Sequence, residues 1–384
     1  MDTDGGRGGG GGTDRISGLP DDLLHAILLR LHCIRSAART SVLSRRWSRV
    51  WTNLPELYLW RLRPILPFSS VSIVDSALAA CSAPTLRRLV INVDDVNLLR
   101  DGVTAAHAAP WLRFASERVA GELFLWLPEV QRGKEDRDLD LPVCAATERI
   151  EIRLRRNFRL RPPPAAAAGV FAGLTRLGIY TGVMDGSELG ALVSSSRCPR
   201  LEELSLTVRV APGSDVSIRS DSLKRLSFKV ENTRRLAVAA PWLLKICVSK
   251  AMEAHIAAPR LAEVEFTDNN GRYEIAEAGR HIQRLVIDLR FPVPAIMRRF
   301  DTIGELIVDV LSIPEGGEGY KMFTKNLSRL DCEALVVRSM WTYHGFAPSM
   351  LHVLRICAGL KKFVVTLSSC VLVPDAHQIA LVPG

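Results

Sequence analysis

The chain has 384 residues, of which 47% are hydrophobic and 24% charged, and its formal net charge is +9. This length allows two domains with a sizeable core, and the apolar fraction excludes a wholly disordered chain. No apolar run reaches the roughly 18–20 residues that a membrane-spanning helix needs. The basic residues are dispersed, so the charge permits an acidic or nucleic-acid partner without requiring one.

The N-terminal residues 1–13 are rich in glycine and predict a disordered tail. The chain has eight cysteines, which form no CxxC pair and no regular framework. Because no apolar leader segment is present either, this spacing predicts reduced, mostly buried thiols and a cytoplasmic or nuclear protein.

Residues 19–57 form a short block with two apolar stripes at helical spacing. Pro20 and two aspartates after it suit the first turn of a helix, and Ser44 is a candidate N-cap for a later one. The first stripe consists of Leu24, Ile27, Leu28 and Leu31, and the second of Trp47, Val50, Trp51 and Leu54. So small a unit cannot bury all of this surface, which predicts a partner.

Four stretches in and just before this block resemble the F-box of plant F-box/leucine-rich-repeat proteins in order, spacing and identity. They are Asp14–Ser17, Leu19–Leu24, Ile27–Leu28 and Arg39–Trp47. The resemblance implies a three-helix F-box over 14–60 that docks on the Skp-type adaptor of a cullin–RING ubiquitin ligase. One departure is His32-Cys33, where the family usually has proline after the first helix. A core helix pair of a larger domain is the alternative interpretation.

The same resemblance implies that the adaptor is contacted by the family-matching apolar positions of this module. These positions are Leu19, Pro20, Leu24, Ile27, Val42, Leu43 and Trp47.

Residues 61–79, with Pro64 and Pro67, are assigned to a linker, and residues 80–384 to a repeat domain. In this domain an apolar-x-x-apolar-x-apolar hexad recurs, from Leu86-Leu89-Ile91 to Leu360-Phe363-Val365. From residue 177 onward the middle apolar residue recurs at steps of 18–29 residues, which is typical of leucine-rich repeats. Because one repeat cannot bury its inner face, the copies must stack into a solenoid.

The fold class predicted is therefore α/β: a three-helix F-box module followed by a leucine-rich-repeat solenoid with a parallel sheet on its concave face. A generic α/β domain with parallel strands is the alternative. Steps near 20 residues leave room for an extended return, and longer steps for helices at Ser187–Ser196, Thr324–Leu330 and Ser349–Leu360. Asp138–Pro142 and Arg161–Gly169 are predicted loops.

Catalytic motifs are missing from the sequence, which lacks the GxxxxGK, GxGxxG, GxSxG and HExxH patterns. The histidines show no metal-ligand spacing with cysteine or carboxylate. We therefore expect no enzyme, no metal and no cofactor, but a binding surface on the concave sheet. Its predicted target-binding residues flank the hexad anchors: Arg176, Tyr180, Glu203, Arg225, Lys229, Lys245, Glu265, Arg284 and Glu305.

The resemblance implies a substrate-recognition subunit of a Skp–cullin–F-box ubiquitin ligase, whose solenoid binds an unknown target protein. One alternative is a hormone-like small-molecule receptor, which a closed apolar pocket rimmed by arginine or lysine would favour. The other is a nucleic-acid-associated protein, which would bind less tightly as salt rises. The sequence shows no aromatic platform interleaved with basic residues, so nucleic acid ranks last.

Overall fold

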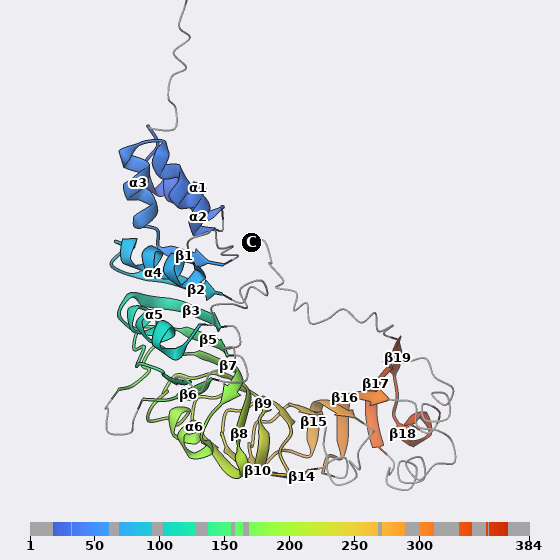
Figure 1. Cartoon of the computed structure of the whole chain (residues 1–384). Helices are drawn as coiled ribbons and strands as arrows, with labels where there is room; N and C mark the ends of the chain where they lie inside the picture. Colours follow the sequence, from blue (N-terminus) through green and yellow to red (C-terminus); the bar gives the residue numbers. More distant parts are fainter. Residues whose placement is uncertain are drawn as a thin grey trace, which may run out of the picture.

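A computed structural model of the chain describes residues 18–31, 33–60, 69–93, 103–127, 137–154, 158–163, 169–267, 271–288, 299–310, 330–339, 351 and 353–367. The predicted glycine-rich tail lies outside these residues. The described chain forms an arc of parallel strands with a helical unit at one end (Figure 1). None of the described helices is long and apolar enough to cross a membrane.

The helical unit contains α1 (Asp21–Leu29), α2 (Ile34–Arg39), the 3-10 helix η1 (Thr40–Val42) and α3 (Arg45–Thr52). Its helix starts follow the sequence signals: α1 begins directly after Pro20, and the Ser44 hydroxyl accepts a hydrogen bond from the Trp47 backbone N–H at 3.4 Å. Although proline is absent after α1, the helix still ends at Leu29. The three-helix module is therefore present.

The first strand of the sheet, β1 (Glu56–Leu59), begins only four residues after α3 ends. It pairs in parallel with β2 (Leu86–Asn92), and its Leu57 and Leu59 are buried. The repeats thus start inside the segment assigned to the F-box, at a hexad that the sequence reading missed. The predicted linker also needs correction, because Ser70–Ala80 form helix α4, with Val74 and Leu78 in the core.

The inner sheet consists of parallel strands that follow one another along the arc. After β1 and β2 come β3 (Val119–Leu127), β5 (Arg149–Leu154), β7 (Arg176–Val183), β8 (Glu203–Arg219), β9 (Arg225–Lys229), β11 (Lys245–Ser249), β13 (Glu263–Phe266), β15 (His281–Asp288), β16 (Thr302–Val310), β17 (Leu330–Ser339), β18 (Cys357–Ala358) and β19 (Lys362–Leu367).

The hexad register is confirmed, because the middle anchors are aligned from strand to strand. Leu204 of β8 pairs with Leu226 of β9, which pairs with Ile246 of β11, and all three are buried. The same alignment continues to Leu285 and Leu306. Each of these copies therefore contributes its middle anchor to one continuous core, as a solenoid requires.

A second row of parallel strands was not predicted. It consists of β4 (Asp138–Asp140), β6 (Arg159–Arg161), the distal parts of β7 and β8, β10 (Glu231–Ala239), β12 (Glu253–Ala257) and β14 (Arg272–Ala276). The short returns are thus hydrogen-bonded strands, and residues 138–140 are a strand where the sequence predicted a loop. Val216, Leu236 and Ile256 of this outer row are buried, so the core lies between the two rows.

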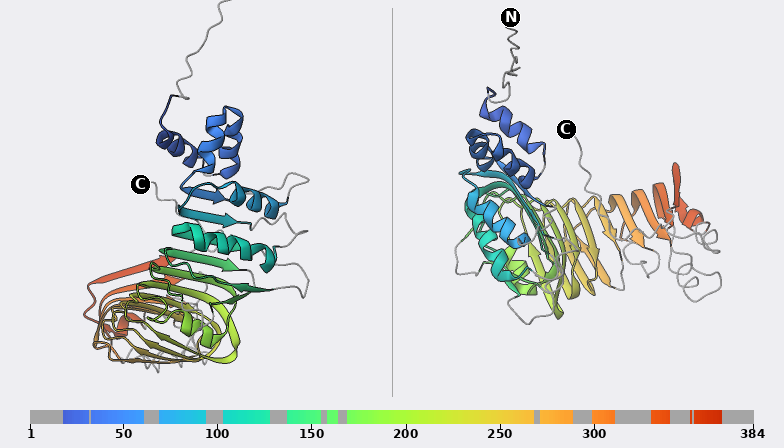
Figure 2. Two further views of the ribbon diagram at one scale, coloured as in Figure 1. Left: turned by 90° about the vertical axis from the view of Figure 1, so that its left-hand side faces the viewer. Right: turned by 45° about the horizontal axis from the view of Figure 1, so that its top comes forward.

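Three helices cover the outer side where the steps are longer: α4, α5 (Ala105–Arg118) and α6 (Gly186–Leu192) (Figures 1 and 2). The predicted helix at 187–196 is confirmed over residues 187–192. The one at 324–330 lies outside the described residues except Leu330, which begins β17. Of the one at 349–360, residues 353–356 are helical and 357–358 form β18.

Candidate functional site

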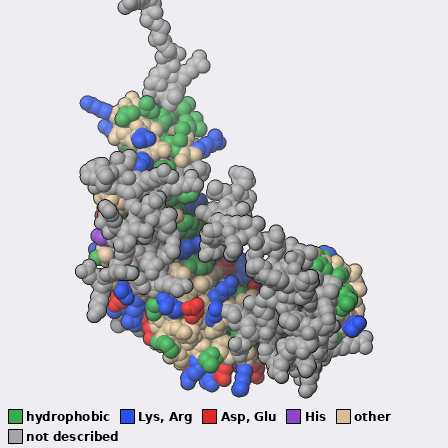
Figure 3. Space-filling view, turned by 45° about the vertical axis from the view of Figure 1, so that its right-hand side comes forward, with side chains coloured by type: hydrophobic (Ala, Val, Ile, Leu, Met, Phe, Trp, Pro, Cys, Tyr) green, Lys and Arg blue, Asp and Glu red, His purple; other side chains and the backbone are tan. Residues whose placement is uncertain are grey.

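The F-box unit exposes large apolar side chains on two of its elements. On α1, Leu23 and Ile27 lie four residues apart, and Leu31 follows four residues later. Between α2 and α3, Val42 and Leu43 are 88% and 64% exposed. In Figure 3, hydrophobic side chains gather over these helices. Contiguous exposed apolar surface on a unit this small marks an interaction surface.

The predicted adaptor-binding residues divide into two groups. Pro20, Ile27, Val42 and Leu43 are exposed and Leu19 is partly buried, so these five are accessible. The other two, Leu24 and Trp47, are only 0% and 5% exposed and belong to the core of the unit. Their direct contact with a partner is a prediction that needs correction, because they hold the helices together instead. The i, i+4 spacing of Leu23, Ile27 and Leu31 could have identified Leu23 and Leu31 in their place.

The second surface is the concave face of the inner sheet, where one row of charged residues precedes the middle anchors. We call it the charged row: Glu56, Arg88, Glu122, Arg149, Arg176, Glu203, Arg225, Lys245, Glu263, Arg284 and Glu305. All of its side chains are exposed or partly exposed. The predicted target-binding residues lie on this face, in or beside the row.

In the half of the charged row that runs from Glu203 to Glu305, which we call the distal half, ion pairs join neighbouring strands. Arg225 pairs with Glu203, Lys245 with Glu263 at 2.9 Å, and Arg284 with Glu305 at 3.2 Å. Each cation here has a carboxylate of its own. Pairs as exposed as these contribute little to stability, about 0–1 kcal/mol each. Of the other predicted residues, Lys229 is exposed, Glu265 partly buried and Tyr180 half-buried.

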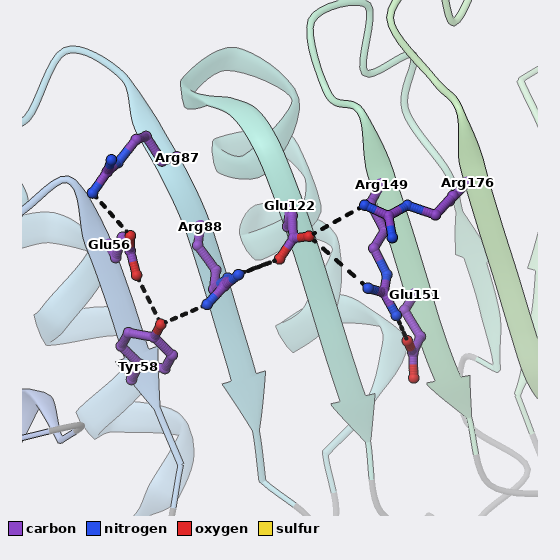
Figure 4. A network of polar contacts seen from close by, with 8 residues as sticks. All are labelled: Glu56, Tyr58, Arg87, Arg88, Glu122, Arg149, Glu151 and Arg176. Atoms are coloured by element: carbon purple, nitrogen blue, oxygen red, sulfur yellow. Dashed lines mark hydrogen bonds and ion pairs between the residues drawn. The ribbon is translucent and has the colours of Figure 1, made fainter. Parts of the chain in front are cut away.

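The proximal half of the charged row, from Glu56 to Arg176, is a connected network centred on Glu122 (Figure 4). Arg88 lies 2.7 Å from Glu122 and donates a hydrogen bond to the Tyr58 hydroxyl at 2.9 Å. Tyr58 in turn donates to Glu56 at 2.7 Å. Burial, with Glu56 adding to it, raises the pKa of Tyr58, so its hydroxyl keeps its proton at neutral pH.

Two further arginines approach Glu122 from the other side, at longer range. Arg149 and Arg176 have nitrogens 3.9 and 3.8 Å from its carboxylate. Arg149 also donates to Glu151 at 3.2 Å, and Glu151 pairs with Arg153 at 2.9 Å. Four arginines thus pair with only two glutamates. Glu122 pairs with Arg88, Arg149 and Arg176, and Glu151 pairs with Arg149 and Arg153.

Aromatic rings lie beside these arginines. The guanidinium carbon of Arg153 lies 4.9 Å from the ring centroid of Trp126 and 5.1 Å from that of Tyr180. Arg149 lies 5.0 Å from the Phe124 ring. We call Phe124, Trp126, Arg149, Arg153 and Tyr180 the aromatic–arginine cluster. The sequence-based statement that no aromatic platform is interleaved with basic residues is therefore wrong, because residues some 27 positions apart become neighbours only when repeats stack.

A glycine makes room for one of these rings. Gly178 of β7 is buried, and a Cβ placed there would lie 2.8 Å from the Tyr180 ring. Any larger residue at this position would thus force the Tyr180 ring to move. Within the described residues, no group of three or more His, Cys, Asp or Glu side chains is placed to hold a metal ion.

The fold and these surfaces define a class of protein: a helical F-box module joined to a leucine-rich-repeat solenoid. Comparison with family models supports each part. Residues 16–58 match the F-box domain, and residues 108–272 match the model of the leucine-rich repeats of the FBD-associated F-box protein At5g56370.

Curated relatives match as well, and the three described here are from Arabidopsis thaliana. The F-box protein At5g03100 is 36% identical over 30% of this chain and 34% of its own length. The F-box/FBD/LRR-repeat protein At5g56420 is 30% identical over 56% of this chain and 48% of its own. The putative F-box/LRR-repeat protein At3g28410 is 26% identical over 91% of this chain and 70% of its own. The chain thus spans a third to a half of the first two relatives. In both of its parts the chain is similar to plant F-box/leucine-rich-repeat proteins.

Proposed function

We propose that this protein is the substrate-recognition subunit of a Skp–cullin–F-box ubiquitin ligase. Proteins of this family are generally non-catalytic adaptors, and F-box domains generally bind Skp1-type adaptors. The observation that carries the proposal is the exposed apolar surface of the F-box unit, where Val42 and Leu43 project into solvent. Burying such a side chain against a partner is worth about 1.5–3 kcal/mol.

The proposed mechanism is tethering. The F-box end binds the adaptor, the concave face holds a target protein, and both then share one complex. This raises the effective concentration of the target beside the ligase without any bond chemistry in the chain itself. The role implies a cytoplasmic or nuclear protein, because a target must meet the ligase there.

Adaptor binding is the test, with purified full-length protein and a Skp1-type adaptor measured by isothermal titration calorimetry. Replacing Leu43 by Asp should weaken binding by tenfold or more, because a carboxylate would have to be desolvated at the contact. Met252→Asp is a matched control, since Met252 is 67% exposed but lies on the solenoid, and it should leave the affinity unchanged.

Leu19→Ala combined with Pro20→Ala should also weaken binding tenfold or more, without unfolding the solenoid, as circular dichroism can check. Unchanged affinity in both F-box variants would refute the assignment. A specific small molecule or nucleic acid retained by the purified chain, with no adaptor binding, would favour the two alternatives instead.

A further inference from the structure

The two halves of the charged row differ in how their like charges are compensated. Across β5 and β7, Arg149 is directly opposite Arg176, and across β9 and β11, Arg225 is directly opposite Lys245. Like charges facing each other across strands are destabilising. Here each cation forms an ion pair with a different carboxylate, Arg225 with Glu203 and Lys245 with Glu263.

Arg149 and Arg176 have no such arrangement. They share Glu122, and that carboxylate is already bound by Arg88 at 2.7 Å. Arg149 finds a second partner in Glu151, but Arg176 has only its 3.8 Å approach to Glu122 and makes no hydrogen bond to any described residue. Its side chain is 44% exposed on the concave face. The network therefore carries surplus guanidinium donors at one place.

The aromatic–arginine cluster borders this place. Tyr180 lies on the same strand as Arg176, four residues further on, and its ring packs on Arg153. The cluster thus offers an apolar edge next to Arg176, whose charge is only partly compensated, because Glu122 is shared with Arg88 and Arg149 and the opposite Glu203 is bound by Arg225. A peptide that carries a carboxylate and a neighbouring aromatic or aliphatic side chain matches both features.

We propose that the concave face over β5 and β7 binds an acidic segment of the target protein. A glutamate or aspartate of that segment lies between Arg149 and Arg176 and accepts hydrogen bonds from both. The side chain beside it packs on the edge of Tyr180. This proposal rests on the target-binding role proposed above, and it specifies the chemistry of the target.

A nucleic acid fits the same place less well. Single-stranded nucleic acid needs free aromatic faces for base stacking, whereas the faces of Trp126 and Tyr180 that meet Arg153 are occupied. The carboxylates of Glu122 and Glu151 lie in the network and would repel a continuous phosphate backbone. One carboxylate at a time avoids this repulsion, so an acidic peptide is the better occupant.

The test is an array of random-sequence peptides probed with labelled full-length protein. Peptides that bind should be enriched in Asp and Glu next to an aromatic or aliphatic residue. The best of them is then titrated by fluorescence polarisation, where Arg176→Ala should weaken binding about tenfold or more, as the loss of a charged hydrogen bond does. The affinity should also fall as sodium chloride is raised.

Arg235→Ala is the charge-matched control. Arg235 is an exposed arginine of the outer row with an ion pair to Glu253 at 3.4 Å, and its loss should leave the affinity within about twofold. Arg176→Lys, which keeps the charge but loses the planar fork, should bind with intermediate affinity.

Three results would overturn the proposal. They are binding peptides without acidic enrichment, equal losses in the Arg176→Ala and Arg235→Ala variants, and tighter binding of a poly-adenylate RNA than of any acidic peptide. None of these measurements requires the adaptor. Failure here would therefore leave adaptor binding intact, and failure of adaptor binding would leave the peptide result intact.

Discussion

The neighbours Leu226 and Arg225 allow the architecture to be tested with two single substitutions. Leu226 is 2% exposed, and its strand neighbours in the core are Leu204 and Ile246. Leu226→Ala removes about three methylene-sized groups, worth about 0.8 kcal/mol each on transfer from water. The cavity left behind adds to this, so the free energy of unfolding should fall by about 2–5 kcal/mol.

Arg225→Ala removes a larger side chain one residue away, but from the concave face. Its guanidinium pairs with Glu203, and the two side chains are 53% and 34% exposed. Water screens such a pair, so the loss should be no more than about 0.5 kcal/mol. The two variants therefore separate burial from charge at adjacent positions of one strand.

The assay is urea unfolding at 25 °C, followed by circular dichroism, with wild type, Leu226→Ala and Arg225→Ala measured side by side. The midpoint should shift strongly for Leu226→Ala and hardly at all for Arg225→Ala. Equal losses would refute the reasoning, because in a solenoid phased as described only one of the two side chains supports the core. A broadened transition in Leu226→Ala alone would still agree, since repeats can unfold in sections.

Three further predictions follow from local features. The Asp185 carboxylate caps α6 by accepting hydrogen bonds from two backbone N–H groups and from the Ser187 hydroxyl, and the Ser187 hydroxyl is the largest cause of its lowered pKa. Asp185→Ala should cost about 1 kcal/mol at pH 7 by urea unfolding, a difference that disappears as the pH falls through the lowered pKa in the folded protein. Gly121→Ala would push a Cβ into the backbone carbonyl of the neighbouring strand and should lower the melting temperature by several degrees, unlike Gly279→Ala, whose Cβ would make only an ordinary 3.8 Å contact with the His281 carbonyl oxygen. Burial raises the pKa of Cys144 to about 12, so iodoacetamide at pH 8 should label half-buried Cys33 long before it, as mass spectrometry can show; equal labelling would contradict the burial.

The inner sheet could be predicted from the sequence because the hexad is a local pattern. Leucines at fixed spacing within six residues fix which side chains of each strand are buried, and the step between copies fixes stacking. The strand at Leu57 was not predicted, because it lies only a few residues after α3 and was assigned to the F-box. Helix α4 escaped because the prolines at 64 and 67 suggested that the segment after them was a linker.

The outer row could not be predicted in the same way. Residues such as Arg235 and Glu253 carry no strong strand preference, and they are held as strands by pairing with the repeats on either side. The F-box contact surface was half predictable. Apolar spacing gives the helix stripe, but packing between α1, α2 and α3 decides which leucines are buried. Leu23 and Leu24 are adjacent in sequence, yet Leu23 is exposed and Leu24 is buried.

The aromatic–arginine cluster shows the same limit at the site. Trp126, Arg153 and Tyr180 each look like ordinary strand residues, and they meet only because the strands lie in register. When the repeats are aligned on their middle anchors, Trp126, Arg153 and Tyr180 occupy the same position of the repeat, three residues after the anchor.

The direct junction between the F-box and the solenoid has a geometric consequence for the proposed ligase. Strand β1 follows α3 after three residues, and Leu28, Ile34 and Leu54 border the same small gap between helices and strand as Glu56 and Tyr58. Among the described residues, only three separate α3 from β1, so the proposed ligase would hold adaptor and target at a set angle and distance. In the proposed ligase, the lysine of a target that receives ubiquitin would then be selected by the target's own shape and by how it lies on the arc, because a rigid junction would not move a remote lysine closer.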